Sequence, residues 1–393
     1  MNSSFSIYLD LVRFLAACLV YLYHSNQRWL IKDILPVSHY GHAAVIVFFV
    51  LSGFVIAWVS DRKERDWPTY AASRVSRVFS VVVPALVVCL LLDGLGRQFW
   101  DKPYGSYPFD NFVLRLGGSL LMLNEVWFVS ITSLSNVPFW SITYEFWYYM
   151  LFAVVTFVRG PQRWWLAGGM LLLLGPKIAL LAPIWACGVL LYRWRALERI
   201  PSVAAWGMVI VSTALIIGLH AVGFFDTVSK LLEPVVGESW YRELTFSKFF
   251  LGDYLLMVLV FCNFAGMRIV APQLAPLFSV ISAPVKWLAG YTFTLYLLHQ
   301  PLFLFWGAVW HGDPGTSKAW WVVTALTALS VVALGQLTEH RREAFRRALQ
   351  RLFTRIEARR TARGQQHAWA DAGLAPHAGH RARRGVADRL GDR

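Results

Sequence analysis

Ten apolar runs, most of them close to 20 residues long, recur along this 393-residue chain. About 20 apolar residues of α-helix are needed to cross a hydrocarbon core of about 30 Å, where every backbone polar group must be satisfied within the segment. The runs therefore predict an all-α fold, a polytopic bundle of transmembrane helices. They lie near residues 7–25, 41–60, 78–96, 138–158, 163–175, 177–192, 203–222, 248–267, 284–309 and 319–338. Gly175-Pro176 separates two of the shorter runs and predicts a tight helical hairpin.

The composition excludes an ordinary soluble domain. Hydrophobic residues make up 57% of the chain and charged residues only 15%, against about 25% charged in a typical soluble domain. The 19 Trp and 27 Phe suit lipid-facing surface and interfacial belts. The four cysteines lie singly inside apolar runs, so their spacing indicates neither a disulfide framework nor a metal site.

The net charge of +14 is concentrated in the C-terminal tail. Residues 341–393 contribute +9 of that excess, so we expect no nucleic-acid partner. Residues 340–360 place apolar side chains at helical spacing among arginines, which predicts an amphipathic helix on an anionic leaflet. After Gly364 the composition predicts disorder. We therefore divide the chain into a transmembrane domain, 1–340, and a basic cytoplasmic tail, 341–393.

Positively charged loops predict the orientation, because short Lys/Arg-rich loops stay in the cytoplasm. The basic segments 61–77, 159–163 and 193–199 and the tail all face one side if residues 111–129 do not cross the membrane. That stretch is then a re-entrant or interfacial helix within an outer 97–137 segment. The result is about ten spans with both termini cytoplasmic. Eleven spans are the alternative, at the cost of dividing the basic segments between two faces.

The first apolar run carries Asp10, Arg13 and His24, although ionisable groups are costly within a membrane. Arg13 and His24 share one helix face because eleven residues make about three turns. Asp10 can pair with Arg13 three residues later. His24 is the best candidate for proton transfer, since imidazole titrates near neutral pH. A structural hydrogen-bonding histidine is the alternative.

Two further polar positions are expected in the outer half of the membrane. Glu145 lies about 10 Å inside the outer face, at the level of His24, where it could orient the imidazole. A structural salt bridge to an arginine is the alternative for this carboxylate. His299, followed by Gln300, lies about 20 Å into its apolar run from the cytoplasmic side. We therefore expect Glu145, His24 and His299 at a similar depth.

Arg74 and Arg77 lie three residues apart just before the third apolar run. Two guanidinium groups at adjacent helical positions can form a fork for phosphate. The alternative is a pair of anchors whose charged heads reach the interface.

Five motifs in this order resemble the acyltransferase-3 family of membrane O-acyltransferases, over roughly residues 5–340. They are Leu9-Asp10-x-x-Arg13 with ten residues before His24, Phe48-Phe49-Val50-Leu51-Ser52-Gly53-Phe54, Arg74-x-x-Arg77, Trp140-Ser141-x-x-x-Glu145-x-x-Tyr148, and Tyr291-Thr292-x-Thr294-Leu295-Tyr296-Leu297-Leu298-His299. Phe14 and Ser80 depart from the family pattern without removing a chemical group. The chain resembles the members that stand alone, without an SGNH-type domain.

The resemblance implies transfer of an acyl group, often acetyl in this family, from cytoplasmic acyl-CoA to a hydroxyl of a cell-surface or lipid-linked carbohydrate. It implies an integral protein of a bacterial inner membrane, whose partners are acyl-CoA, the carbohydrate or glycolipid acceptor and the bilayer. Neither a metal nor a permanently bound cofactor is expected. The rival interpretation is a transporter or flippase of a glycan precursor or acyl group.

The same resemblance assigns roles to ten residues. His24 is the general base or the acyl carrier, supported by Glu145 and Arg13. Arg74 and Arg77 bind the phosphates of the CoA donor. The residues expected to contact the substrates are Asp10, Ser52, Ser141, Tyr291 and His299.

Overall fold

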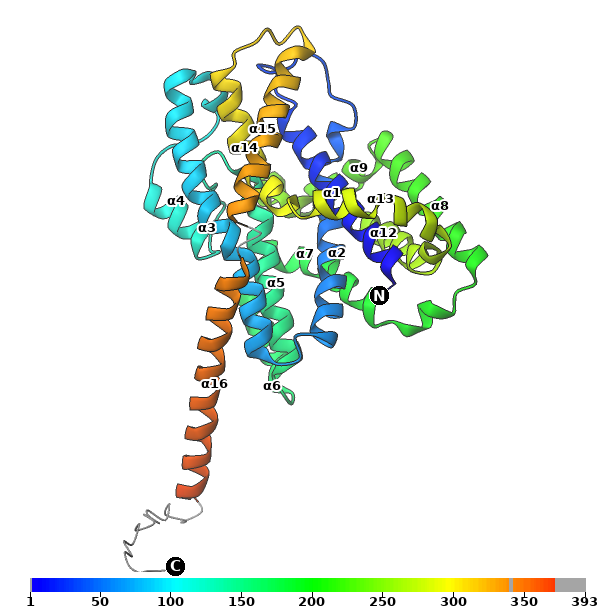
Figure 1. The fold of residues 1–393 in the computed structure, drawn as a ribbon, viewed down its shortest axis with the longest axis vertical. Coiled ribbons are helices and arrows are strands. Elements are labelled where there is room, and N and C mark those ends of the chain that lie inside the picture. The colour runs from blue at the N-terminus through cyan, green and yellow to red at the C-terminus, as the bar shows by residue number, and fades with distance from the viewer. Residues whose placement is uncertain (1, 339–341, 372–393) are drawn as a thin grey trace, which may run out of the picture.

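The computed structural model describes residues 2–338 and 342–371, and every regular element within them is helical (Figure 1). The longer helices are α1 (Ser3–Ser25), α2 (Gly41–Arg62), α3 (Trp67–Phe99), α5 (Trp140–Phe157), α6 (Gln162–Leu174), α7 (Pro176–Arg193), α8 (Ser202–Ala221), α12 (Phe250–Val270), α13 (Ala275–Ala289), α14 (Thr292–Val309), α15 (Ser317–Leu337) and α16 (Arg342–Asp371). The shorter α-helices are α4 (Phe112–Leu120), α9 (Phe224–Lys230), α10 (Glu233–Val236) and α11 (Glu238–Glu243). The 3₁₀ segments are η1 (Ser38–Tyr40), η2 (Lys102–Tyr104), η3 (Val137–Phe139), η4 (Arg195–Arg199), η5 (Thr245–Phe249) and η6 (Ala271–Leu274).

The predicted all-α bundle of membrane-spanning helices is confirmed. Within the described residues, seven helical stretches are long and apolar enough to cross a membrane. They are Ser3–Ser25, Ser38–Arg62, Trp67–Phe99, Pro176–Arg193, Ser202–Ala221, Thr245–Ala289 and Ser317–Leu337. The helices α5, α6 and α14 coincide with predicted runs but are not among the seven, so the count of ten spans stays a prediction.

Helix ends follow the local sequence. Asn2 caps α1 by accepting a hydrogen bond from the Ser4 backbone N–H at 2.8 Å, and Asp66 caps α3 through the Thr69 N–H at 2.8 Å. The predicted hairpin is confirmed, because α6 ends and α7 begins at Gly175-Pro176. Gly175 has φ +87°, and an added Cβ there would lie 2.6 Å from the Trp127 Cα, so glycine is required at this turn.

The helix α2 occupies the centre of the bundle and crosses α7 at very short range. A Cβ at Gly53 would lie 2.0 Å from the Trp185 carbonyl oxygen, and one at Gly188 would lie 1.9 Å from the Val50 carbonyl oxygen. Small residues let membrane helices approach closely, where van der Waals packing replaces the hydrophobic effect. The crossing fixes the face of α2 that carries Ser52.

The stretch 111–129 is helical only over α4, and the residues after it form an irregular segment inside the bundle. Met122, Asn124 and Glu125 are buried there. The Glu125 carboxylate accepts a hydrogen bond from the buried Lys177 ammonium at 2.7 Å. Irregular backbone is tolerated at membrane depth where protein surrounds it. The prediction of one helix across 111–129 is therefore too long.

The predicted run 284–309 is divided in the structure. The helix α13 ends at Ala289 and α14 begins at Thr292, and Figure 1 shows α13 lying across the bundle while α14 runs along it. His299 is therefore about 10 Å from the start of α14. The prediction of one continuous helix, with His299 about 20 Å into it, is wrong.

The tail differs from its prediction in two respects. The helix α16 runs from Arg342 to Asp371, so the expected disorder after Gly364 is wrong up to residue 371, and residues 372–393 lie outside the described part of the chain. Its first part packs against α3, with Phe353 against the Trp67 ring at 6.0 Å, before the helix continues beyond the bundle (Figure 1). Phe353 therefore contacts another part of the protein. The sequence had predicted that this face of the helix lies on the lipid leaflet.

The glycine contact between α2 and α7 makes a stability prediction. Replacing Gly188 with Val should lower the free energy of unfolding by about 1–3 kcal/mol or more, because backbone atoms of α2 occupy the space. Gly168→Val in α6 is the matched control, since nothing lies within 4 Å of a Cβ there. Thermal unfolding of both purified variants measures the difference. Equal melting temperatures would contradict the close crossing.

Candidate functional site

A cavity of about 400 Å³ lies at the centre of the bundle, between α1, α2, α3, α5, α13 and α14. It brings together seven of the ten residues that the sequence predicted. These are Asp10, Arg13, Ser52, Arg74, Arg77, Ser141 and Glu145. Residues as distant in sequence as Asp10 and Tyr296 thus line one space.

Glu145 is held in this cavity by hydroxyl groups. Its Oε1 accepts hydrogen bonds from the Ser52 hydroxyl and from the Tyr149 hydroxyl, each at 2.5 Å. The indole N–H of Trp185 donates to the Ser52 oxygen at 3.2 Å and fixes that side chain in turn. These are the hydrogen bonds of the Glu145 side chain among the described residues. The expected contact with His24 is therefore wrong.

Positive charge prevails along the cavity walls. Asp10 pairs with Arg13 at 3.5 Å, as the sequence predicted. Lys286 of α13 lines the same space and was missed, although a lysine inside an apolar run is the same signal that identified Arg13. Four cations, Arg13, Arg74, Arg77 and Lys286, face two carboxylates, so the cavity favours an anionic ligand.

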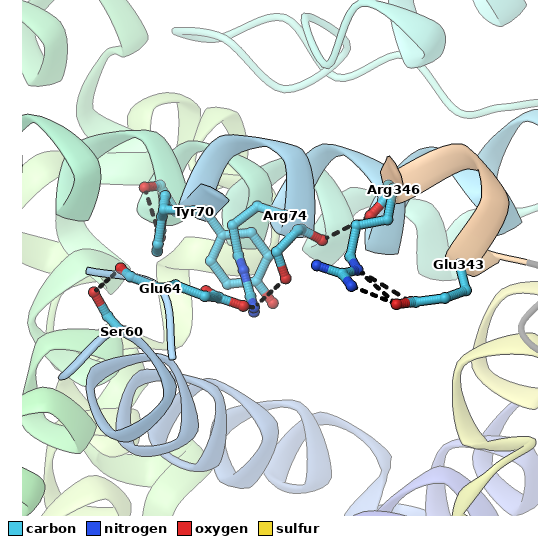
Figure 2. Close-up of polar contacts among 9 residues, drawn as sticks. Ser60, Glu64, Tyr70, Arg74, Glu343 and Arg346 are labelled. Carbon is cyan, nitrogen blue, oxygen red and sulfur yellow. Dashed lines mark hydrogen bonds and ion pairs between the residues drawn. The ribbon is translucent and has the colours of Figure 1, made fainter. Parts of the chain in front are cut away.

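Arg74 is buried against a carboxylate. Its guanidinium donates to Glu64 at 2.6 Å (Figure 2). It also donates to the Ser73 hydroxyl at 2.8 Å. Figure 2 also shows Arg346 and Glu343 of α16 next to this pair. Hydrogen bonding to Glu343 raises the pKa of Arg346, and the charge of Glu64 adds to that effect. Arg74 therefore lines the cavity with its charge already paired to Glu64. The sequence had instead predicted that Arg74 and Arg77 together form an unpaired fork for phosphate.

His24 lies outside the cavity wall and faces His299. The two imidazole rings, on α1 and α14, have their centroids 5.2 Å apart. The expectation that these two histidines lie at one level is confirmed. His24 is half-buried, whereas His299 is completely buried.

The backbone determines the tautomer of His299. Its Nδ1 lies 2.8 Å from the Tyr296 carbonyl oxygen and 3.1 Å from that of Leu295, so Nδ1 carries the proton. The buried Nε2 then carries a lone pair, for which the described residues offer no hydrogen-bond partner. A buried ring nitrogen without a partner among the described residues indicates a polar space for water or ligand beside Nε2 of His299.

Tyr296 joins the cavity to the histidine pair. Its hydroxyl lies 2.5 Å from the Ser141 hydroxyl in the cavity wall, and its ring lies 6.3 Å from that of His299. Tyr291, by contrast, packs on Trp287 and accepts a hydrogen bond from Gln336 of α15. The structure therefore places Tyr291 in a helix junction, beside the cavity but not among its lining residues.

The Arg74–Glu64 pair makes a second prediction. Glu64→Gln should lower the free energy of unfolding by about 3 kcal/mol or more, because it leaves a buried guanidinium without its counter-charge. Glu343→Gln breaks the exposed pair with Arg346 and should cost less than about 1 kcal/mol. Thermal unfolding of the two variants makes the comparison. A Glu64→Gln protein as stable as Glu343→Gln would show that the buried pair is not formed.

Comparisons with known proteins agree with this architecture. The chain matches the family described as "Acyltransferase domain" over residues 6–335, which ends just before α16. It is 29% identical over 172 residues to the acyltransferase MdmB of Streptomyces mycarofaciens. That match spans 40% of this chain and 42% of the relative, and no solved structure matches. With this family match covering most of its length, the chain belongs to the acyltransferase-3 family.

Proposed function

We propose that this protein transfers an acyl group, acetyl in the simplest case, from cytoplasmic acyl-CoA to a hydroxyl of a cell-surface or lipid-linked carbohydrate. The observation that carries the proposal is a cationic cavity joined through Tyr296 to a histidine pair. The cations suit a phosphorylated donor, and the imidazoles suit removal of a proton from an alcohol. We place the protein in a bacterial inner membrane with both termini in the cytoplasm.

The donor occupies the central cavity in this proposal. Arg77 and Arg74 contact its phosphates, and Lys286 adds a further cation on the facing helix α13. A volume of about 400 Å³ suits the pantetheine arm better than a whole CoA molecule, so the nucleotide stays at the mouth. Arg13 lies along the path of the arm, where its pairing with Asp10 holds its position.

The reaction takes place between the cavity and the histidines. His24 removes the proton of the acceptor hydroxyl, whose oxygen attacks the thioester carbonyl. The Ser141 and Tyr296 hydroxyls stabilise the negative charge on the carbonyl oxygen. The C–S bond then breaks, and the proton passes from His24 to the leaving CoA sulfur. Glu145 accepts hydrogen bonds from the Ser52 and Tyr149 hydroxyls and thereby orients both groups in the cavity wall.

His24→Ala should reduce acyl transfer at least 100-fold, because general-base catalysis contributes about 10²–10⁴. Purified protein in nanodiscs is given labelled acetyl-CoA and glycan extract, and labelled product is counted. Tyr23→Phe is the control, since it keeps the ring beside His24 and removes only a hydroxyl. Undiminished transfer by His24→Ala would exclude the mechanism. A protein that forms no acylated product but carries the acceptor across proteoliposomes would be a carrier instead.

Arg77→Ala should weaken acetyl-CoA binding about 10-fold, since a charge-assisted hydrogen bond is lost. The effect should fall on KM, with kcat largely kept, because Arg77 contacts a part of the donor that does not react. Arg159→Ala removes the same charge from the exposed turn between α5 and α6 and serves as control. Equal KM values for the two variants would remove Arg77 from the donor site.

A further inference from the structure

A second and larger cavity, of about 1220 Å³, opens where α1, α2, α5, α7, η4 and α12 come together. It shares no lining residue with the central cavity. One part of its lining is aromatic and is formed by Phe5, Phe54, Trp58, Phe152 and Phe157. Such a lining suits the apolar part of a ligand.

The remaining lining residues carry mainly positive charge. Five arginines line this cavity, Arg62, Arg65, Arg193, Arg195 and Arg268, against two carboxylates, Asp61 and Glu198. Both carboxylates are engaged, Asp61 by the Tyr192 hydroxyl at 2.6 Å and Glu198 by Arg268. Within residues 2–338 and 342–371, the other four arginines form no ion pair. Their charge is available to an anion.

Two further residues in the lining carry hydrogen-bond donors that have no acceptor among the described residues. The Trp58 indole N–H and the Thr156 hydroxyl are buried, and neither has a partner among the described residues. Buried polar groups are nearly always satisfied, so unpaired ones indicate a missing ligand or water. The Arg193 guanidinium already lies over the Phe152 ring, 5.8 Å from its centroid, which positions it at the boundary of aromatic and charged surface.

We propose that this cavity binds an anionic phospholipid, whose phosphate meets the arginines while its apolar part lies against the aromatic side chains. The shared chemistry is that of an organic phosphate with an apolar body. A lipid is favoured over a soluble phosphate because the cavity combines both surfaces and opens at helix ends, where basic pockets hold lipid headgroups. The site is independent of the acyl-transfer reaction proposed above.

The test compares lipid retention by the full chain. Wild-type protein, Arg193→Gln/Arg195→Gln and Arg159→Gln are reconstituted in phosphatidylcholine nanodiscs with and without phosphatidylglycerol. Co-purified lipid is measured by native mass spectrometry, and melting temperature by intrinsic fluorescence. We expect phosphatidylglycerol to be retained by wild type and by the Arg159 control, and to raise their melting temperatures. The double variant should retain at least about 10-fold less phosphatidylglycerol.

Three results would overturn the proposal. Retention of phosphatidylglycerol could be equal in all three proteins, or absent from wild type. Alternatively, the double variant could lose affinity for CoA while keeping the lipid, which would assign the arginines to a soluble phosphate. If the double variant does not fold, Arg193→Lys/Arg195→Lys and Trp58→Phe give the answer. The lysine variant keeps the charge and should retain the lipid, whereas Trp58→Phe removes one donor and should weaken retention.

Discussion

The cost of leaving a polar group unpaired in a membrane governs this structure. Lys177 and Glu125 are almost completely buried and form an ion pair, and Arg74 is matched by Glu64 in the same way. Breaking such a pair leaves an uncompensated charge, which is far more costly than the pair itself is stabilising. The Lys177–Glu125 pair therefore ties together segments that are 52 residues apart in sequence, and the Arg74–Glu64 pair joins α3 to the loop that precedes it.

Close packing provides the rest of that arrangement. Gly53 and Gly188 let α2 and α7 approach until backbone meets backbone. The approach brings Trp185 within hydrogen-bonding distance of Ser52, which in turn donates to Glu145. A packing requirement in the apolar core thus sets the orientation of a polar side chain in the cavity. The chemistry of the site and the stability of the bundle rest on the same helix crossing.

The division of the polar residues into two groups has a consequence for the acyl transfer proposed above. In that proposal the cationic cavity holds the donor and the histidine pair meets the acceptor hydroxyl, with Tyr296 between them. Keeping donor binding and proton transfer in adjacent spaces lets the two substrates approach from different directions. If His24 is the base, as proposed, the fixed tautomer of His299 places a second lone pair, on Nε2, beside it.

The sequence by itself determined that the chain is a helical membrane protein and that Asp10, Arg13, Glu145 and His24 are unusual positions. It could do so because hydropathy and the cost of buried charge are local properties of a segment. Only the tertiary structure decided the partners: Ser52 and Tyr149 for Glu145, Glu64 for Arg74, and His299 for His24. Sequence spacing gives the depth of a residue in a helix, but the rotation and crossing of helices depend on packing between them. For that reason the expected contact between Glu145 and His24 does not form, and the two residues belong to separate groups in the folded protein.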